Sequence, residues 1–459
     1  MSYVLNRWEP ENAAFWQQEG RRVARRNLWI SIPALLLAFA IWQVWSVVVV
    51  NMPNIGFNYT PNQLFWLAAL PALSGATLRI FYSFMVPIFG GRKWTTLSTA
   101  SLLIPALGIG FAVQDTSTSY VTMMILALLC GLGGGNFSSS MANISFFFPK
   151  AEKGTALGLN AGLGNLGVSV VQFLVPLVIT AGVFGALGGE PQTWVKEGVS
   201  KPMWLQNAGF IWVPFIVLST LCAWFGMNDI ASAKASFADQ AVIFKRKHNW
   251  LMCWLYIGTF GSFIGFAAGF PLLIKSQFPG IDPTRYAFLG PLVGALARPF
   301  GGWLSDRIGG ARVTQAVFAM MIVAVFGVLA FLPEQGVGGS FWGFFACFLA
   351  LFLLTGIGNG STFMQVPVIF LTLHQRWAGK GETAQRQATA EATKEAAAVL
   401  GFSAAIGAYG GFFIPKSYGT SIALTGGVEA ALYAFIVFYV SCLAINWWFY
   451  ARRGAEGPC

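Results

Sequence analysis

Charge is scarce in this chain of 459 residues: Asp, Glu, Lys and Arg make up only 10% of it, whereas hydrophobic residues make up 56%. Soluble domains carry about 25% charged residues, so this composition excludes a water-soluble protein. Apolar runs of about 20 residues recur along the whole sequence, which is the length that a helix needs to cross a bilayer. The sequence therefore predicts an all-α polytopic membrane protein.

Histidine is nearly absent, and the cysteines show no pattern. The two histidines, His248 and His374, are placed in polar loops. The six cysteines have no CxxC spacing and no neighbouring histidine; they are Cys130, Cys222, Cys253, Cys347, Cys442 and Cys459. We therefore expect neither a disulfide framework nor a metal site. Because there is also no nucleophile–base pair and no phosphate-binding loop, we expect neither an enzyme nor a bound cofactor.

The apolar segments predict twelve membrane-spanning helices. They cover roughly 28–50, 62–89, 94–113, 120–147, 154–183, 207–228, 249–275, 285–305, 312–332, 340–372, 393–418 and 427–450. The preceding arm, residues 1–27, is either an amphipathic helix at the membrane interface or a plain basic tail. A polar excursion between the tenth and eleventh helices, residues 373–392, continues into a helix and receives no assigned role.

The basic residues are distributed unevenly over these segments. If the N-terminus is cytoplasmic, the inner segments hold 21 of the 28 Lys and Arg, and the outer loops and helix ends hold five. An excess of Lys and Arg marks the cytoplasmic side, so both termini are predicted to be cytoplasmic. The net charge of +11 is then a signal of topology and not of nucleic-acid binding.

The two remaining basic residues, Arg79 and Arg298, fall deep within spans, and none of the 17 Asp and Glu does. Their surroundings repeat: "LPALSGATLR" aligns without gaps on "LGPLVGALAR", with five of ten positions identical, and a Gly-Gly pair begins eleven residues after each arginine. We therefore predict two six-helix halves, 28–228 and 249–459, joined by a cytoplasmic linker, 229–248. Parallel repeats of this kind are the arrangement of major-facilitator transporters.

The loop "GGWLSDRIGGAR" supports the same reading. It resembles the superfamily signature between the eighth and ninth spans, in which Asp306 and Arg307 would pair with a helix end and latch one conformation. The first half has Pro87 in place of the aspartate, so any latch is asymmetric.

A charge near the bilayer centre is costly and usually faces a cavity or a partner. Each arginine lies roughly 16 Å along a helix from its Gly-Gly pair, which argues against snorkelling to the interface. A structural ion pair is the other alternative, but no carboxylate falls within a span to supply it. We favour an anion site in which Arg79 and Arg298 bind a flat oxyanion, because the guanidinium fork matches that shape.

Glycine-rich stretches in the fifth and eleventh spans indicate how such a site could open. Glycine allows close helix packing and also leaves room for a helix to bend or slide; packing alone is the alternative. The gating candidates are Gly162, Gly164, Gly167, Gly407, Gly410 and Gly411.

Several long motifs resemble the bacterial NarK-type nitrate/nitrite porter family: "LRIFYSFMVPIFGG", "NFSSSMANISFFFPK", "GLGNLGVS", "ALARPFGG" and "GGFFIPK". The resemblance extends from "WEPENAAFWQQ" to the last span. It implies a major-facilitator fold in which the two arginines hold the substrate. It also implies that Phe137 and Phe260 sandwich the anion, and that Tyr256 and Asn165 are further substrate-binding residues.

The expected function is nitrate and nitrite transport in the bacterial inner membrane by a monomer. Nitrate-in, nitrite-out antiport is favoured, because the spans contain no candidate Asp, Glu or His to carry a proton and Arg does not deprotonate in proteins. A proton-coupled nitrate symporter is the nearest alternative. A porter for another small anion and an anion channel are further alternatives.

Overall fold

The computed structural model describes residues 3–233 and 236–459, and it is helical along most of this length. By their contacts the residues form two compact units, Met1–Ala235 with Ala267–Leu292 and Ser236–Phe266 with Val293–Cys459. The predicted boundaries of the halves and the linker remain predictions.

The first half of the chain, as far as it is described, contains twelve α-helices, two 3-10 helices, one π-helix and four short strands. In chain order they are β1 Val4–Leu5, α1 Ala13–Phe15, the π-helix η1 Trp16–Gly20, α2 Arg21–Trp42, α3 Trp45–Asn51, η2 Pro53–Ile55, α4 Pro61–Tyr82, α5 Met85–Phe89, α6 Gly91–Ser101, α7 Leu103–Ala112, α8 Tyr120–Leu129, α9 Gly131–Phe147, α10 Lys150–Val178, η3 Gly185–Gly188, β2 Gln192–Lys196, β3 Val199–Met203, α11 Asn207–Phe210, α12 Trp212–Gly226 and β4 Asp229–Ile230. Strand β1 pairs with β4 in parallel, and β2 pairs with β3 in antiparallel orientation.

The second half of the chain is built from longer helices. In chain order they are α13 Phe237–Gln240, η4 Ala241–Lys245, α14 Lys247–Tyr256, the π-helix η5 Ile257–Gly261, α15 Ser262–Gln277, η6 Pro283–Arg285, α16 Leu289–Ile308, α17 Gly310–Phe331, α18 Phe341–Trp377, α19 Glu382–Gly407, α20 Gly410–Thr425, α21 Glu429–Asn446 and the π-helix η7 Trp447–Ala451.

Eleven helical segments among the described residues are long and apolar enough to cross a membrane. Helix α16, at the position of the eighth predicted span, is 20 residues long but is not among them. It carries Arg298, Asp306 and Arg307, which lower its hydropathy. The predicted all-α polytopic membrane fold is confirmed.

Capping residues explain where several spans begin. Thr60 accepts a hydrogen bond from the backbone N–H of Gln63, whose side chain accepts one from the N–H of Thr60, and Pro61 occupies the first helical position of α4. Ser119 and Ser340 cap α8 and α18 in the simpler way, with a side-chain oxygen at a free N–H of the first turn.

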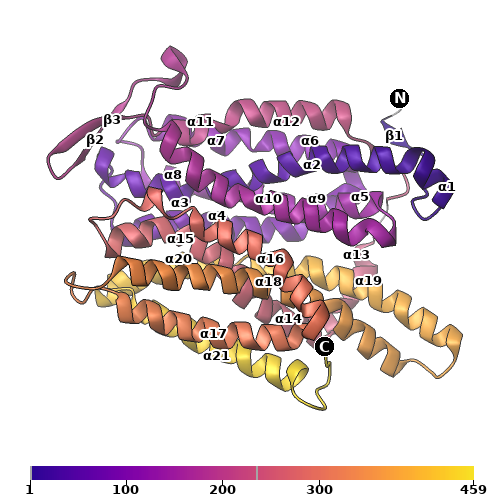
Figure 1. The fold of residues 1–459 in the computed structure, drawn as a ribbon. Coiled ribbons are helices and arrows are strands. Elements are labelled where there is room, and N and C mark those ends of the chain that lie inside the picture. The colour runs from indigo at the N-terminus through magenta and orange to yellow at the C-terminus, as the bar shows by residue number, and fades with distance from the viewer. Residues whose placement is uncertain (1–2, 234–235) are drawn as a thin grey trace. The chain divides into compact units, whose positions relative to one another are not determined.

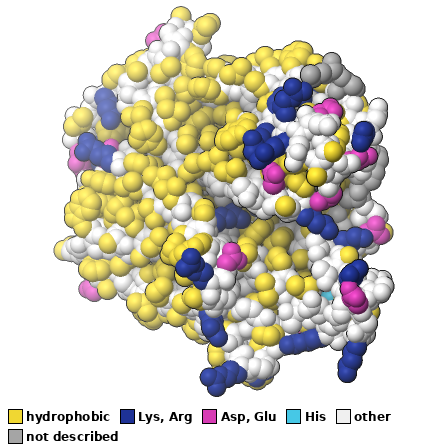
Figure 2. Space-filling view, turned by 45° about the vertical axis from the view of Figure 1, so that its right-hand side comes forward, with side chains coloured by type: hydrophobic (Ala, Val, Ile, Leu, Met, Phe, Trp, Pro, Cys, Tyr) yellow, Lys and Arg dark blue, Asp and Glu magenta, His cyan; other side chains and the backbone are white. Residues whose placement is uncertain are grey.

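Each unit consists of long helices that run side by side (Figure 1). In the first unit α2 packs on α9 and α10, and α4 packs on α9. In the second unit α18 lies between α17 and α19, and α21 packs on α17. Hydrophobic side chains cover wide areas of the face shown in Figure 2. Among the exposed large hydrophobic residues of the protein are Phe111, Leu218, Val323, Phe326 and Val437. Such surfaces are expected where helices face lipid.

The first span is broken, and the seventh contains a π-helical turn. Helix α2 ends at Trp42 and the span resumes with α3. In the seventh span the helix stays continuous but passes through the π-helix η5 between α14 and α15. A π-helical turn displaces side chains from their regular positions and often lies at a functional site. Phe260, one of the predicted substrate residues, belongs to this turn.

Helix extends beyond the predicted spans at two places. The first candidate span already begins at Ala13 rather than near residue 28. Ahead of and within it, Trp8 donates a hydrogen bond to the carbonyl of Phe146 and Trp16 donates one to Glu152, so this arm packs on protein. The predicted excursion at 373–392 is mostly helical, because α18 continues to Trp377 and α19 starts at Glu382.

Candidate functional site

Arg79 is a cation enclosed by the first unit. It lies near the end of α4 and is 1% exposed. Its Nε donates a hydrogen bond to the carbonyl oxygen of Gly134 at 2.9 Å. Its guanidinium carbon lies 4.7 Å from the ring centroid of Phe137 and 4.9 Å from that of Trp42. These three neighbours are uncharged groups, and each offers a carbonyl oxygen or the negative face of a ring to the cation.

Small residues allow Trp42 to approach this position. A Cβ atom at Gly75 would lie 2.4 Å from the indole Nε1 of Trp42, and one at Gly134 would lie 2.6 Å from it. The indole N–H donates to the carbonyl oxygen of Pro71 at 2.8 Å, which satisfies the one polar atom of a fully buried ring.

Arg298 is held more loosely, in the second unit. It lies on α16 and is half-buried. Its Nη2 makes a long contact of 3.5 Å to the hydroxyl of Tyr256, and its guanidinium carbon lies 5.5 Å from the Phe363 ring. Tyr256 in turn stacks on Phe260, with ring centroids 5.5 Å apart and planes inclined by 17°. The structure thus brings three of the predicted residues together here: Arg298, Tyr256 and Phe260.

Asn165 and the three glycines of the fifth span lie on α10. Asn165 is 1% exposed, and among the described residues its Oδ1 has no hydrogen-bond partner. Buried amide oxygens are almost always bonded, so this atom is suited to a ligand or a water. Gly164 and Gly167 pack closely on α2, whereas a Cβ at Gly162 would meet open space.

The glycines of the eleventh span flank the break between α19 and α20. A Cβ at Gly407 would lie 2.6 Å from the Tyr256 ring, and one at Gly410 would lie 2.5 Å from the Cα of Gly261. The N–H of Gly411 donates to the carbonyl of Ala408 across the break. Close packing therefore accounts for Gly407 and Gly410, and a gating role for the glycines stays a prediction.

Asp306 and Arg307 lie exposed at the end of α16. Arg307 packs over the Trp303 ring of its own helix, with its guanidinium carbon 4.4 Å from the centroid. Asp306 forms no ion pair among the described residues. A latch made by these two residues remains a prediction.

A carboxylate that the sequence analysis missed occupies the matching turn of the first unit. Gly90 has a φ of +91°, and Asp229 lies directly against it, where a Cβ would come within 2.3 Å of its Oδ1. Oδ1 accepts from the backbone N–H of Arg92 at 2.8 Å, and Oδ2 lies 3.5 Å from its Nε. The guanidinium also packs between the rings of Tyr3 and Trp224, at 4.3 and 4.2 Å. Asp229 therefore caps α6 and pairs with its first basic residue.

A second missed carboxylate, Glu395, is buried on α19. It accepts two hydrogen bonds from Arg246, at 2.9 and 2.8 Å, and lies 3.1 Å from Nε2 of His374. These hydrogen bonds raise the pKa of Arg246 above its ordinary value. The expectation that both histidines lie in polar loops is wrong, because His248 and His374 are buried on α14 and α18. Each lies near a helix end beside a carboxylate, which is Glu456 for His248 and Glu395 for His374.

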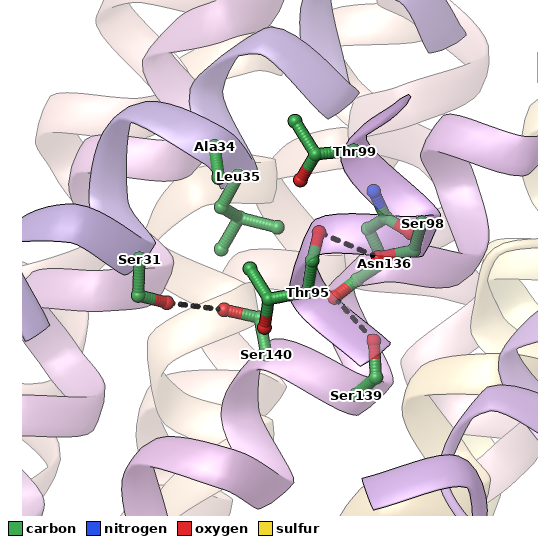
Figure 3. A pocket seen from close by; sticks show the side chains of 9 residues that line it. All are labelled: Ser31, Ala34, Leu35, Thr95, Ser98, Thr99, Asn136, Ser139 and Ser140. Atoms are coloured by element: carbon green, nitrogen blue, oxygen red, sulfur yellow. Dashed lines mark hydrogen bonds between the residues drawn. The ribbon is translucent and has the colours of Figure 1, made fainter. Parts of the chain in front are cut away.

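A small polar cavity lies between α2, α6 and α9 (Figure 3). Its volume is about 10 Å³, which is room for about one water and too little for a four-atom anion. The side chains of Thr99 and Asn136 each carry an oxygen that has no hydrogen-bond partner among the described residues. The cavity is lined by Ser31, Ala34, Leu35, Thr95, Ser98, Thr99, Asn136, Ser139 and Ser140. It is suited to a bound water and not to the substrate.

Comparison with known proteins assigns the family. The family described as Major Facilitator Superfamily matches residues 34–385. The chain is 54% identical to the nitrate/nitrite transporter NarU of Salmonella typhimurium, over 98% of this chain and 97% of that protein. The chain belongs to the NarK-type porter family of the Major Facilitator Superfamily.

Two further matches agree with this assignment. The porter is 46% identical to the probable nitrate/nitrite antiporter NarK2 of Thermus thermophilus, over 98% of this chain and 97% of that protein. Its fold resembles the crystal structure of a bacterial homolog of the human lysosomal transporter Spinster in an inward-facing, occupied conformation, with a TM-score of 0.62. That match covers 91% of this chain and 95% of the other at 14% identity, and it shows the shared fold alone.

Proposed function

We propose that this porter carries nitrate and nitrite across the membrane by alternating access, and that both Arg79 and Arg298 bind the anion. The names of the relatives, nitrate/nitrite transporters, support the substrate class. The observation that carries the binding proposal is the burial of Arg79, at 1% exposure, against a carbonyl and two aromatic rings. A fixed cation in such surroundings gains most from an anionic ligand.

The chemistry of guanidinium favours a planar oxyanion. Its donors lie in one plane and match two oxygens of nitrate or nitrite, which a point-like ammonium does not. On the second unit, Tyr256 adds a hydroxyl and Phe260 adds a ring face beside Arg298. Phe137 adds a ring face beside Arg79. Asn165, whose Oδ1 has no hydrogen-bond partner in the described part of the chain, is the remaining polar candidate.

Antiport follows from the same charges. Without an anion, the mutual repulsion of the two cations and the cost of their desolvation oppose closure of the carrier, so the empty form changes sides slowly and one anion must leave for another to enter. We propose nitrate-in, nitrite-out exchange on this ground. The name of the Thermus relative, a probable antiporter, supports it.

We further propose that the porter works as a monomer in the cytoplasmic membrane, with both termini in the cytoplasm. The excess of Lys and Arg on the predicted inner segments supports this orientation. Labelling of a single introduced cysteine at either terminus, from one side of the membrane only, tests the orientation. Light scattering of the detergent-solubilised protein tests the monomer.

Counterflow in proteoliposomes tests the transport proposal. Vesicles loaded with nitrite should take up labelled nitrate without an imposed pH gradient, and empty vesicles should take up little. A protonophore should leave this exchange unchanged. Uptake by empty vesicles that follows an imposed proton gradient would establish symport instead, and chloride or formate in place of nitrite should not support exchange.

A further inference from the structure

Trp42 is a buried residue of the first unit to which neither the sequence patterns nor the family resemblance assigns a role. Its indole ring faces the guanidinium carbon of Arg79 at 4.9 Å, and the ring is fully buried. We propose that Trp42 is a positioning residue for the transported anion: its ring holds the Arg79 guanidinium in the orientation that binds nitrate or nitrite. This inference rests on the proposed role of Arg79 in binding.

The contacts of Trp42 and Arg79 are coupled through a single glycine. The carbonyl oxygen of Gly134 accepts a hydrogen bond from Nε of Arg79. Because Gly134 has no side chain, the indole of Trp42 fits beside it. The indole is fixed from the other side by its hydrogen bond to Pro71. Phe39 completes the arrangement, because its ring touches both Trp42 and Phe137 at centroid distances of 5.7 and 6.0 Å. The guanidinium thus lies against the rings of Trp42 and Phe137, and both of these rings pack on Phe39.

An aromatic ring can orient the Arg79 guanidinium without adding a negative charge beside it. The negative face of the ring attracts a cation, and it supplies no counter-charge. A carboxylate in the same place would fix the arginine equally well but would compete with the substrate for it. Trp42 therefore orients the cation and leaves its charge to the anion.

The experiment compares Trp42→Phe with Trp42→Leu. Both remove the hydrogen bond to Pro71, but only phenylalanine keeps a ring face, so the difference between them isolates the ring. A cation–π contact in desolvated surroundings corresponds to a change of about 10-fold in affinity. In nitrite-loaded vesicles we expect Trp42→Leu to raise the KM for nitrate about 10-fold, and Trp42→Phe to raise it less than about 3-fold, with a smaller change in kcat.

Trp45 provides a matched control, because it is equally buried and lies one turn further along the same span. Trp45→Phe and Trp45→Leu should leave KM unchanged even where they lower the melting temperature. Equal KM values for the two Trp42 variants, or a KM shift in the Trp45 variants of the same size, would overturn the proposal.

A second measurement covers the case in which Trp42→Leu does not fold. Fluorinated tryptophans introduced at position 42 alone keep the shape and the N–H donor of the indole but weaken the negative ring face. KM should rise with each added fluorine at position 42 and stay constant for the same series at position 45. A flat series at position 42 refutes the role of the ring. If Arg79→Lys also transports with a normal KM, the binding proposal itself fails; if only the Trp42 series is flat, only this inference fails.

Discussion

Arg79 and Arg298 occupy matching positions in the two repeats, but their surroundings differ. Arg79 is 1% exposed, with a 2.9 Å hydrogen bond to a main-chain carbonyl and two rings within 5 Å. Arg298 is half-buried and has a 3.5 Å contact to a tyrosine hydroxyl and one ring at 5.5 Å. The guanidinium of Arg79 is therefore held by short contacts, whereas that of Arg298 is held by longer ones. Both repeats thus carry an arginine at this position, but the residues that contact it differ.

The largest expected effect comes from replacing either arginine by lysine. Arg79→Lys loses the Nε donor to Gly134 and the flat face that packs on Trp42. Loss of charge-assisted hydrogen bonds to the anion corresponds to about 100-fold or more in kcat/KM. Arg298→Lys should cost less, about 10-fold, because its present contacts are looser. Counterflow kinetics of both variants at equal protein content measure the difference in kcat/KM. An equal fall in kcat/KM for the two variants would show that the closer contacts of Arg79 do not contribute to transport.

The second comparison concerns the Gly-Gly turns that follow the arginines. At the first, Asp229 caps α6 and pairs with Arg92 in buried surroundings. At the second, the main-chain oxygen of Cys459 accepts from the N–H of Ala311 on α17, and Asp306 points to solvent. In both repeats the chain that follows the last helix of the half returns to this turn, but the partner is a side-chain carboxylate at the first turn and a main-chain oxygen at the second.

Asp229→Asn should therefore destabilise the protein, whereas Asp306→Asn should not. Removing one partner of a buried ion pair costs about 3–5 kcal/mol, and an exposed substitution changes stability by about 0.5 kcal/mol or less. Thermal unfolding in detergent should show a clear fall in melting temperature for Asp229→Asn alone. Arg92→Gln should reproduce this fall, and the double variant should add little to either single one. Independent effects would mean that the two residues do not act as a pair.

The features that could be predicted from the sequence are those that show as a repeat or as a local pattern of residues. The two arginines, the Gly-Gly pairs and most spans follow from apolar length and from alignment of one half on the other. Trp42 and Asp229 could not be found in this way, because each acts through a partner far away in the sequence: Arg79 for the first and Arg92 for the second. Their only local signals were weak: Trp42 precedes a helix break, and Asp229 directly follows a span.

The histidines show the opposite error. A polar neighbourhood in the sequence suggested loops, but His248 and His374 are buried at helix ends. Hydropathy averages over a window and so cannot identify a polar side chain that is buried because it has a partner. For His374 that partner is Glu395, which also binds Arg246.

The backbone of the same turns offers a finer test. Gly90 and Gly309 have φ angles of +91° and +95°, a region that costs other residues about 1–3 kcal/mol. A Cβ at Gly90 would also come within 2.3 Å of Asp229, whereas at Gly309 the nearest atom is the main-chain oxygen of Cys459, at 3.3 Å. Gly90→Ala should therefore lower the melting temperature more than Gly309→Ala. Gly90→Ala should also lower the melting temperature less when it is introduced into an Asp229→Gly background than into the unmodified protein, because the clash with the carboxylate is then absent.

The smallest expected effect concerns the segment from Glu456 to Cys459, which contacts the second Gly-Gly turn through the hydrogen bond from Ala311 to Cys459. Glu456 lies on the segment that carries Cys459 to α17, and its carboxylate accepts from Lys247 at 2.6 Å and lies 3.2 Å from Nε2 of His248. The hydrogen bond from Lys247 lowers the pKa of Glu456 below its ordinary value of 4.5. The stabilisation is therefore present above pH 4.5 and is lost as the pH falls through the lower pKa of the folded state. Because the pair is partly exposed, Glu456→Gln should cost about 1 kcal/mol or less at neutral pH. Melting curves should separate the variant from the unmodified protein at pH 7 and bring the two together in acid; a constant gap across this range would show that the carboxylate charge does not anchor the segment.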